Sequence, residues 1–483
     1  MRISIVKKFL LTLVTLCFYA VANGQQQPDS LMQYLEIAAK NNPYLLQKFS
    51  EYQAALQKVP QVGSLPDPEL NVGVFLSPME LIGGNQVADI RLMQMFPWFG
   101  VLKNAKDEMS LMAKAKYELF RDAKLQVFYD VQRTWYNLYR IQQDIHISEK
   151  NIEILRTLER LALVKFKSVS TGSTSASPTG GNMSNSNTQS SSSGSSGMNS
   201  MGGNSANNQS TNNTQPSMAN GQSAMGSSAG GSGLADLYRI QIEIGELDNN
   251  ISLLKSQQTT IIARFNTYLN RPVKTMVMIP DTLKSHSLGI SLLAVPDSML
   301  ANNPMLDMLQ YEQQSFDTRK KMVSRMSYPM IGIGVNYSLI NKSDMSTSNM
   351  NGTDMIMPMV TVTLPIYRKK YKAMQTEADL MKSATEQGYT ATANSLQTEY
   401  YEAMQLYQDA ERRMKLYENQ SQLAKKSLDI MIKSFSASSS GLTDILRLQQ
   451  QTLDYEFKQV EALVDYNTSI AWLKRLMAFS QIQ

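Results

Sequence analysis

The sequence predicts a mostly helical protein with a few membrane-spanning β-strands, built from a duplicated unit of helix, strand, strand, very long helix and helix. Three observations carry this prediction. Short motifs recur in the same order in both halves of the chain. Two very long stretches are nearly free of glycine and proline, and four short segments alternate between apolar and polar residues.

The first 24 residues are typical of a secretory signal peptide. Three basic residues precede an apolar run over residues 9–22, and Ala22-Asn23-Gly24 offers a cleavage site. The run is short for a spanning helix, which is the alternative. The single cysteine, Cys17, lies in this segment after Leu16, so we expect no lipid anchor, disulfide or thiolate site in the mature chain. No later run is long and apolar enough to predict a transmembrane helix.

The internal repeat sets the domain organisation. The motif Asn41-Asn42-Pro43 recurs as Asn302-Asn303-Pro304, and GLADLYRIQ at 233–241 recurs as GLTDILRLQ at 441–449. We therefore expect two repeats, at 25–270 and 301–483, joined by a linker or equatorial segment at 271–300.

Each repeat contains a very long predicted helix, at 101–167 and 366–435, followed by a second helix at 234–270 or 442–480. At 1.5 Å per residue the long helices reach roughly 100 Å. Their apolar residues follow the spacing of a coiled-coil seam, although a helical bundle core would explain the seams equally well. The seam residues are Leu138, Ile141, Ile145, Ile152, Leu155, Ala162 and Phe166 in one helix and Leu453, Phe457, Val460, Val464 and Ala471 in another, interrupted by Ser148, Glu159 and Asn467.

Two strand pairs are predicted, at about 68–96 and 330–364. Leu70, Val72 and Val74 share one face, and the other three segments alternate in the same way. Strands of about ten residues span a bilayer when tilted. Because the long helices use their seams on each other, lipid is the better partner for the apolar faces. An open sheet edge is excluded in lipid, so several copies must share one barrel, and we favour a homotrimer with twelve strands.

The chain resembles the TolC family of outer-membrane efflux channels over nearly its whole mature length. The ordered duplication carries the resemblance, and LPDPELNVG at 65–73 and FPWFGVLKNAK at 96–106 resemble the branch that exports heavy-metal cations. The resemblance implies a trimeric twelve-stranded barrel in the outer membrane, continued by a long periplasmic α-helical barrel. It also implies a periplasmic adaptor and an inner-membrane RND-type pump as partners. Many members of the metal branch carry an N-terminal lipidated cysteine, which this chain lacks.

A Ser/Asn/Gly/Met-rich segment at 168–232 replaces a tight turn. The interval from Pro97 to Gly233 is 136 residues, whereas the interval from Pro365 to Gly441 is 76. We therefore place the segment as a disordered insert at the tip of one helical hairpin, which the resemblance puts at the periplasmic end.

Methionine is frequent, with 31 residues, and its thioether suits soft cations such as Cu(I). By alternation Met93, Met95, Met357 and Met359 face the lumen, where they would make weak contacts with a soft cation. Filling of irregular apolar space is the competing explanation. Five further methionines lie in the insert: Met183, Met198, Met201, Met218 and Met225.

Four charged residues are further candidates. Asp236 and Asp444 follow the repeated glycines, and threefold symmetry would gather six carboxylates at the narrow end, although helix N-termini also favour acids. Asp89 and Arg91 are predicted to face the barrel lumen. His146 is expected on a helix surface, away from any partner at metal spacing.

The predicted function is a passive exit duct for Cu- or Ag-type cations, with no catalytic residue, no cofactor and no nucleic-acid partner. The alternatives are an exit duct for organic compounds, a secreted coiled-coil structural protein and a periplasmic methionine-rich copper-binding protein.

Overall fold

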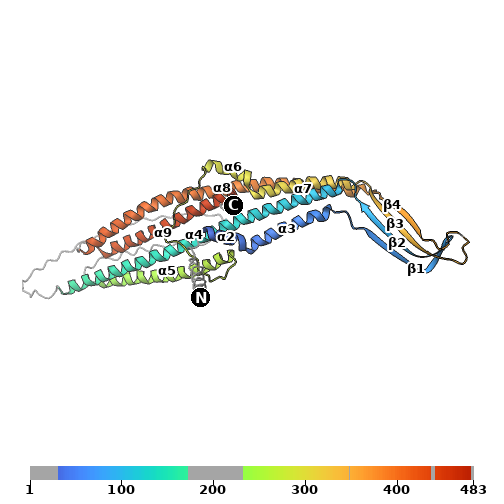
Figure 1. Ribbon diagram of the computed structural model, residues 1–483. Coiled ribbons are helices and arrows are strands. Elements are labelled where there is room, and N and C mark those ends of the chain that lie inside the picture. The colour runs from blue at the N-terminus through green and yellow to red at the C-terminus, as the bar shows by residue number, and fades with distance from the viewer. Residues whose placement is uncertain (1–30, 172–231, 348, 437–440, 480–483) are drawn as a thin grey trace, which may run out of the picture.

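The computed structural model describes residues 31–171, 232–347, 349–436 and 441–479. The molecule is elongated, with a β-sheet at one end and two helical hairpins running away from it (Figure 1). The ends of these hairpins away from the sheet are called the tip. The predicted signal peptide and nearly all of the predicted insert, with its five methionines, lie outside the described residues.

The sheet has four antiparallel strands in the order β1-β2-β3-β4. The strands are β1 (Glu69–Leu81), β2 (Gly84–Phe96), β3 (Met330–Asn341) and β4 (Met355–Thr363). Strands β2 and β3 pair directly although more than two hundred residues separate them in sequence. The sheet therefore joins the two repeats side by side.

Each half also has a helix that ends just before its first strand. These are α3 (Pro43–Gly63) after α2 (Leu31–Asn41), and α7 (Pro304–Met326) after η1 (Leu292–Ala294) and α6 (Val295–Asn302). The repeated Asn-Pro explains both starts. The Asn42 side chain accepts hydrogen bonds from the amides of Tyr44 and Leu45, and Asn303 accepts one from Met305, with proline at the first helical position.

The long helices are α4 (Val101–Thr171) and α8 (Arg368–Ser436), and their companions are α5 (Ser232–Tyr268) and α9 (Leu442–Leu476). With 71 residues, α4 is roughly 105 Å long. It extends beyond the predicted end at residue 167, and α5 begins slightly earlier than predicted, since serine and threonine can continue a helical turn. Pro97 and Pro365 lie where strands give way to helices, and α8 begins at Arg368 after a short turn.

Three apolar clusters hold the helices together. One joins α2, α4, α5 and α9 near the middle of the molecule, one joins all four long helices toward the tip, and one joins α6, α8 and α9. The predicted seams are largely buried in these clusters. Phe166 is the exception, with 41% of its surface exposed, because it lies in the last two turns of α4. No helix among the described residues is both long and apolar enough to span a membrane.

Candidate functional site

The register of the sheet separates a polar face from an apolar face. Paired residues on neighbouring strands point to the same side, so each row across the sheet belongs to one face. One row contains Asn71, Arg91, Asn336 and Met357. Apolar residues dominate the alternating rows, although Gln94 lies in the row of Ile333 and Val360. Nine of these apolar residues are 40–73% exposed: Leu70, Val72, Val74, Ile90, Leu92, Ile333, Val335, Val360 and Val362. The chain therefore presents an uncovered apolar surface on one side of the sheet.

The structure places the four predicted lumen methionines on the polar face. Met93 and Met359 lie in one row with Gly334 between them. A Cβ atom built on Gly332 would lie 2.6 Å from the Met95 sulfur and 3.6 Å from the Met93 sulfur. The two sulfur atoms are therefore no more than about 6 Å apart, since both lie so close to one point. Glycine at 332 leaves room for both thioethers, because a Cβ atom there would collide with the Met95 sulfur.

Asp89 and Arg91 also lie on the polar face. Asp89 shares a row with Gly73 and Ser338, and a Cβ on Gly73 would collide with the Asp89 carboxylate. The Arg91 Nε atom is buried without a hydrogen-bond partner among the described residues.

At the tip, polar contacts join the two hairpins. Arg239 on α5 donates a hydrogen bond to the Thr443 hydroxyl on α9 at 3.0 Å, and the Gln450 amide donates to Glu243 at 2.8 Å. These exposed hydrogen bonds contribute less to holding the two hairpins together than the apolar cluster beneath them does.

The predicted acids lie beside these contacts. Asp444 lies in the first turn of α9 and is exposed, and Asp236 lies just after the first turn of α5 and is half-buried. The helix dipole therefore stabilises the Asp444 carboxylate more than the Asp236 carboxylate.

A polar cavity of about 320 Å³ lies between α4, α5 and α9 near the middle of the molecule. Its wall includes Arg133, Arg140 and Arg264, with Asp130 and Asp465. The Asp465 carboxylate is already engaged, because it accepts a hydrogen bond from Arg413 of α8 at 2.7 Å.

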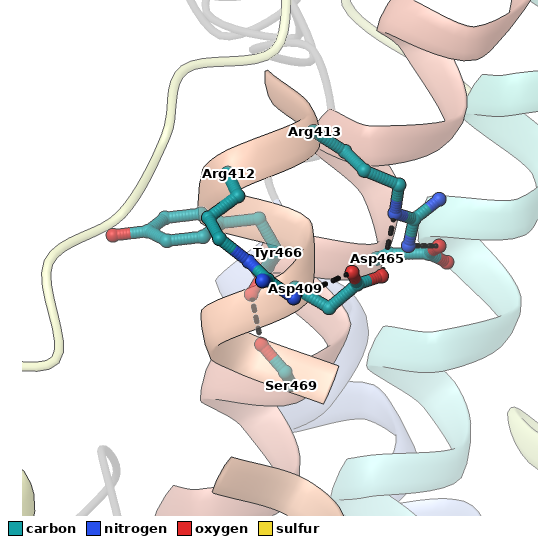
Figure 2. Close-up of polar contacts among 6 residues, drawn as sticks. All are labelled: Asp409, Arg412, Arg413, Asp465, Tyr466 and Ser469. Carbon is teal, nitrogen blue, oxygen red and sulfur yellow. Dashed lines mark hydrogen bonds and ion pairs between the residues drawn. The ribbon is translucent and has the colours of Figure 1, made fainter. Parts of the chain in front are cut away.

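Figure 2 shows how the Asp465 contact extends along α8. Arg413 also donates to Asp409 at 2.7 Å, and Asp409 in turn accepts from Arg412 at 3.1 Å. Arg413 thus links two carboxylates from different helices and fixes α8 against α9.

Burial perturbs one carboxyl group near this cavity. Burial raises the pKa of Asp144 on α4 to about 7, although Arg140 opposes the rise and Glu461 of α9 adds to it. Its Oδ1 atom is buried without a hydrogen-bond partner among the described residues. Asp144 thus changes charge near neutral pH.

An extended segment, residues 271–291, crosses the helices and is held by side chains that bond to its backbone. The Tyr34 and Tyr139 hydroxyls accept from the amides of Met278 and Leu283. Asn467 accepts from the His286 amide and donates to the Lys284 carbonyl. The sequence identifies Asn467 only as an interruption of a seam, because nothing local indicates which segment crosses over it.

His146 is exposed on α4, as predicted. Among the described residues, no group of three or more His, Cys, Asp or Glu side chains could hold a metal ion.

Comparison with solved structures identifies the fold. The outer membrane protein VceC from Vibrio cholerae aligns with a TM-score of 0.65 at 11% identity, covering 93% of this chain and 96% of that one. The Campylobacter jejuni CmeC outer membrane channel gives a TM-score of 0.66 at 14% identity, over 94% and 87% of the two chains. The chain has the TolC-type channel fold.

CusC, whose structures describe transmembrane channel formation, matches this TolC-type fold equally well. It gives a TM-score of 0.66 at 12% identity and covers 94% of this chain and 95% of that one. Because the three scores are nearly equal, the fold does not distinguish one branch of the family from another. The sequence matches no protein-family model and no curated protein.

Proposed function

We propose that the protein is the outer-membrane channel of a tripartite efflux system. It is a passive duct that receives its substrate from a periplasmic adaptor and an inner-membrane RND-type pump. The TolC-type fold supports this function, and the solved structures with that fold are described as outer-membrane proteins or channels. The sheet lies in the outer membrane, the helices extend into the periplasm, and the protein acts without a catalytic residue.

The observation that carries the proposal is the uncovered apolar face of a sheet with two free edges. Val360 and Leu70 are 73% and 63% exposed on the outermost strands, and β1 and β4 each pair with only one described strand. A lipid bilayer removes the unfavourable free energy of exposing the apolar face to water. In lipid, however, the backbone groups of both sheet edges must be hydrogen-bonded to another strand. Pairing β4 of one copy with β1 of the next satisfies both needs, and three copies close a twelve-stranded barrel.

The helices offer a matching surface for trimer formation. Tyr238, Ile242 and Leu253 of α5 are 54–63% exposed, and on the opposite flank Leu423 and Ile430 of α8 are 67% and 66% exposed. Burying such residues between neighbouring copies would continue the helical layer into a closed tube.

The decisive experiment is a conductance measurement on purified protein in planar bilayers, together with native mass spectrometry. We expect a trimer that forms steady pores and that migrates differently on gels before and after heating. A water-soluble monomer without pore activity would refute the proposal. It would favour the secreted coiled-coil protein instead.

Heavy-metal cations are the proposed substrate class. Soft thioether sulfur is a ligand for Cu(I), and the two sulfur atoms above Gly332 lie on the polar face of the sheet. We expect a strain lacking the protein to become sensitive to copper and silver. A double Met93→Leu and Met95→Leu variant should restore resistance only partly, because leucine keeps the volume but removes the sulfur.

A Met276→Leu variant provides the control for the metal assignment, since Met276 is 80% exposed outside the sheet. If the double variant restores full resistance to copper and silver, these methionines only fill space in the sheet. Sensitivity of the deletion strain to detergents alone would replace metals by organic substrates. Stoichiometric Cu(I) binding without pore activity would favour a copper-binding protein.

At the tip, Asp236 and Asp444 are proposed to form a ring of carboxylates around the opening in the trimer. Such a ring attracts cations by its field. Replacing both by asparagine should lower the preference of the pore for cations in reversal-potential measurements, while the flux of neutral solutes through the pore stays the same. An unchanged preference would leave the two residues with a helix-capping role.

A further inference from the structure

Aromatic and basic residues follow one another in sequence at the connections between the sheet and the helices. Figure 1 shows these connections at the end of the sheet that faces the helices. Between β2 and α4, Trp98 and Phe99 come first and Lys103 and Lys106 follow in the first turns of α4. Trp98 stacks on Tyr328, which lies between α7 and β3, with ring centroids 5.3 Å apart. Aromatic rings thus gather beside the sheet.

The second repeat shows the same order between β4 and α8. Ile366 and Tyr367 are 71% and 76% exposed beside the sheet, and four bases follow at the start of α8. At the end of α7, Lys321 and Arg325 precede Tyr328, so the bases again lie farther from the sheet than the aromatic ring. At all three connections, aromatic residues therefore lie next to the sheet and basic residues lie farther from it.

We define the basic collar as the exposed bases at these three connections. None of them forms an ion pair with a described residue. Its members are Lys103, Lys106, Lys321, Arg325, Arg368, Lys369, Lys370 and Lys372. Nearby Lys320 and Arg319 are excluded because they pair with Asp379 and Glu377.

Few acidic residues lie near enough to offset the positive charge of the basic collar. Asp107 lies on α4 beside Lys103 and Lys106, and the α3–β1 connection carries Asp67 and Glu69 instead of bases. The collar therefore keeps a large net positive charge on three of the four connections.

We propose that the basic collar binds the phosphate groups of anionic phospholipids in the leaflet that faces the periplasm. This inference rests on the proposed channel function, which puts the apolar sheet face in the bilayer. Aromatic rings lie preferentially at the level of the headgroups, and bases next to them meet the charged surface. Charge complementarity and continuity with the apolar face select a lipid surface as the occupant.

The collar therefore sets the depth of the barrel in the membrane and favours anionic over zwitterionic lipid. Because the attraction is electrostatic, the preference weakens as salt screens it.

The test uses the full-length protein with two kinds of vesicle, one of phosphatidylcholine alone and one that also contains phosphatidylglycerol. Lipids retained by the protein are counted by native mass spectrometry, and binding is measured at low and high salt. The test variant replaces Arg368, Lys369, Lys370 and Lys372 with glutamine. A matched control replaces four exposed bases nearer the tip that form no ion pair with a described residue: Lys150, Arg156, Lys426 and Arg447.

We expect the wild type and the control to prefer the anionic vesicles. The collar variant should bind them at least about tenfold more weakly, with unchanged binding to phosphatidylcholine and unchanged pore conductance. Unchanged conductance shows that the variant is folded.

Equal binding of the wild type to both lipids would overturn the collar inference and leave the channel proposal intact. Failure of the wild type to insert into either vesicle would instead refute the channel. Loss of a periplasmic protein partner in the collar variant, without any change in lipid binding, would identify the collar as a protein-binding surface.

Discussion

Asp144 gives the sharpest prediction about stability, and the perturbation is Asp144→Asn. The carboxyl lies on α4 between Arg140 of its own helix and Glu461 of α9, with one oxygen buried and unpartnered among the described residues. Asparagine has nearly the same shape but cannot ionise. The variant therefore isolates the contribution of the charge.

The magnitude follows from the pKa. Burial raises the pKa of Asp144 from 3.8 to about 7, so between these values the folded protein binds more protons than the unfolded chain. Stability contributed by this group therefore falls as pH rises from about 4 to 7 and is constant above that range. Because one pKa unit corresponds to about 1.36 kcal/mol, the ionised carboxylate costs about 4 kcal/mol at pH 8.

The assay compares apparent Tm of the purified wild type and variant in detergent from pH 4 to pH 8. The Asp144→Asn variant should match the wild type near pH 4 and exceed it increasingly toward pH 8. Glu153→Gln, at an exposed position on the same helix, should show no widening gap. A gap between wild type and Asp144→Asn that stays constant with pH would refute the burial argument.

Three further predictions concern the sheet, the charged contacts and the tip. Gly334→Val should lower the yield of folded, heat-modifiable protein, because its Cβ would lie 2.7 Å from the Leu92 carbonyl oxygen, whereas Gly245→Ala, in open space, should not. Arg413→Ala should lower stability by about 1–3 kcal/mol in thermal unfolding, by leaving Asp465 unpaired, and an added Asp465→Asn should restore part of it. Arg239→Ala should raise pore conductance in bilayers by loosening the tip contact, and unchanged conductance would assign that contact no role in closure.

The sequence was a sufficient guide to the strands and long helices, because both depend on local periodicity. Alternation over Ile331, Ile333 and Val335 identifies a strand without knowledge of its neighbours, and the absence of glycine and proline allows a helix to continue. Helix ends were less predictable, because a Ser/Thr-rich segment such as the end of α4 continues a turn or stops at little cost. The trimer stays a prediction.

The candidate site was predictable only in part. Alternation placed Met93, Met95 and Asp89 on one face, and the register agrees. The meeting of two sulfur atoms above Gly332 depends on which strand pairs with which residue, and the cavity beside Asp465 depends on three helices. Such contacts arise from long-range packing, which local sequence patterns do not encode.

A buried polar pair between α4 and α9 fixes how these two helices align. An apolar seam alone would let α4 and α9 slide past each other by a heptad with little loss of burial, as in coiled coils that lack a polar residue to fix the register. Asn151 on α4 is buried and accepts a hydrogen bond from Gln449 on α9, a contact that forms in one register only. The same hairpins also meet at the tip, where Arg239 on α5 donates a hydrogen bond to the Thr443 hydroxyl on α9. The buried pair therefore costs some apolar contact and in return fixes the register of α4 against α9.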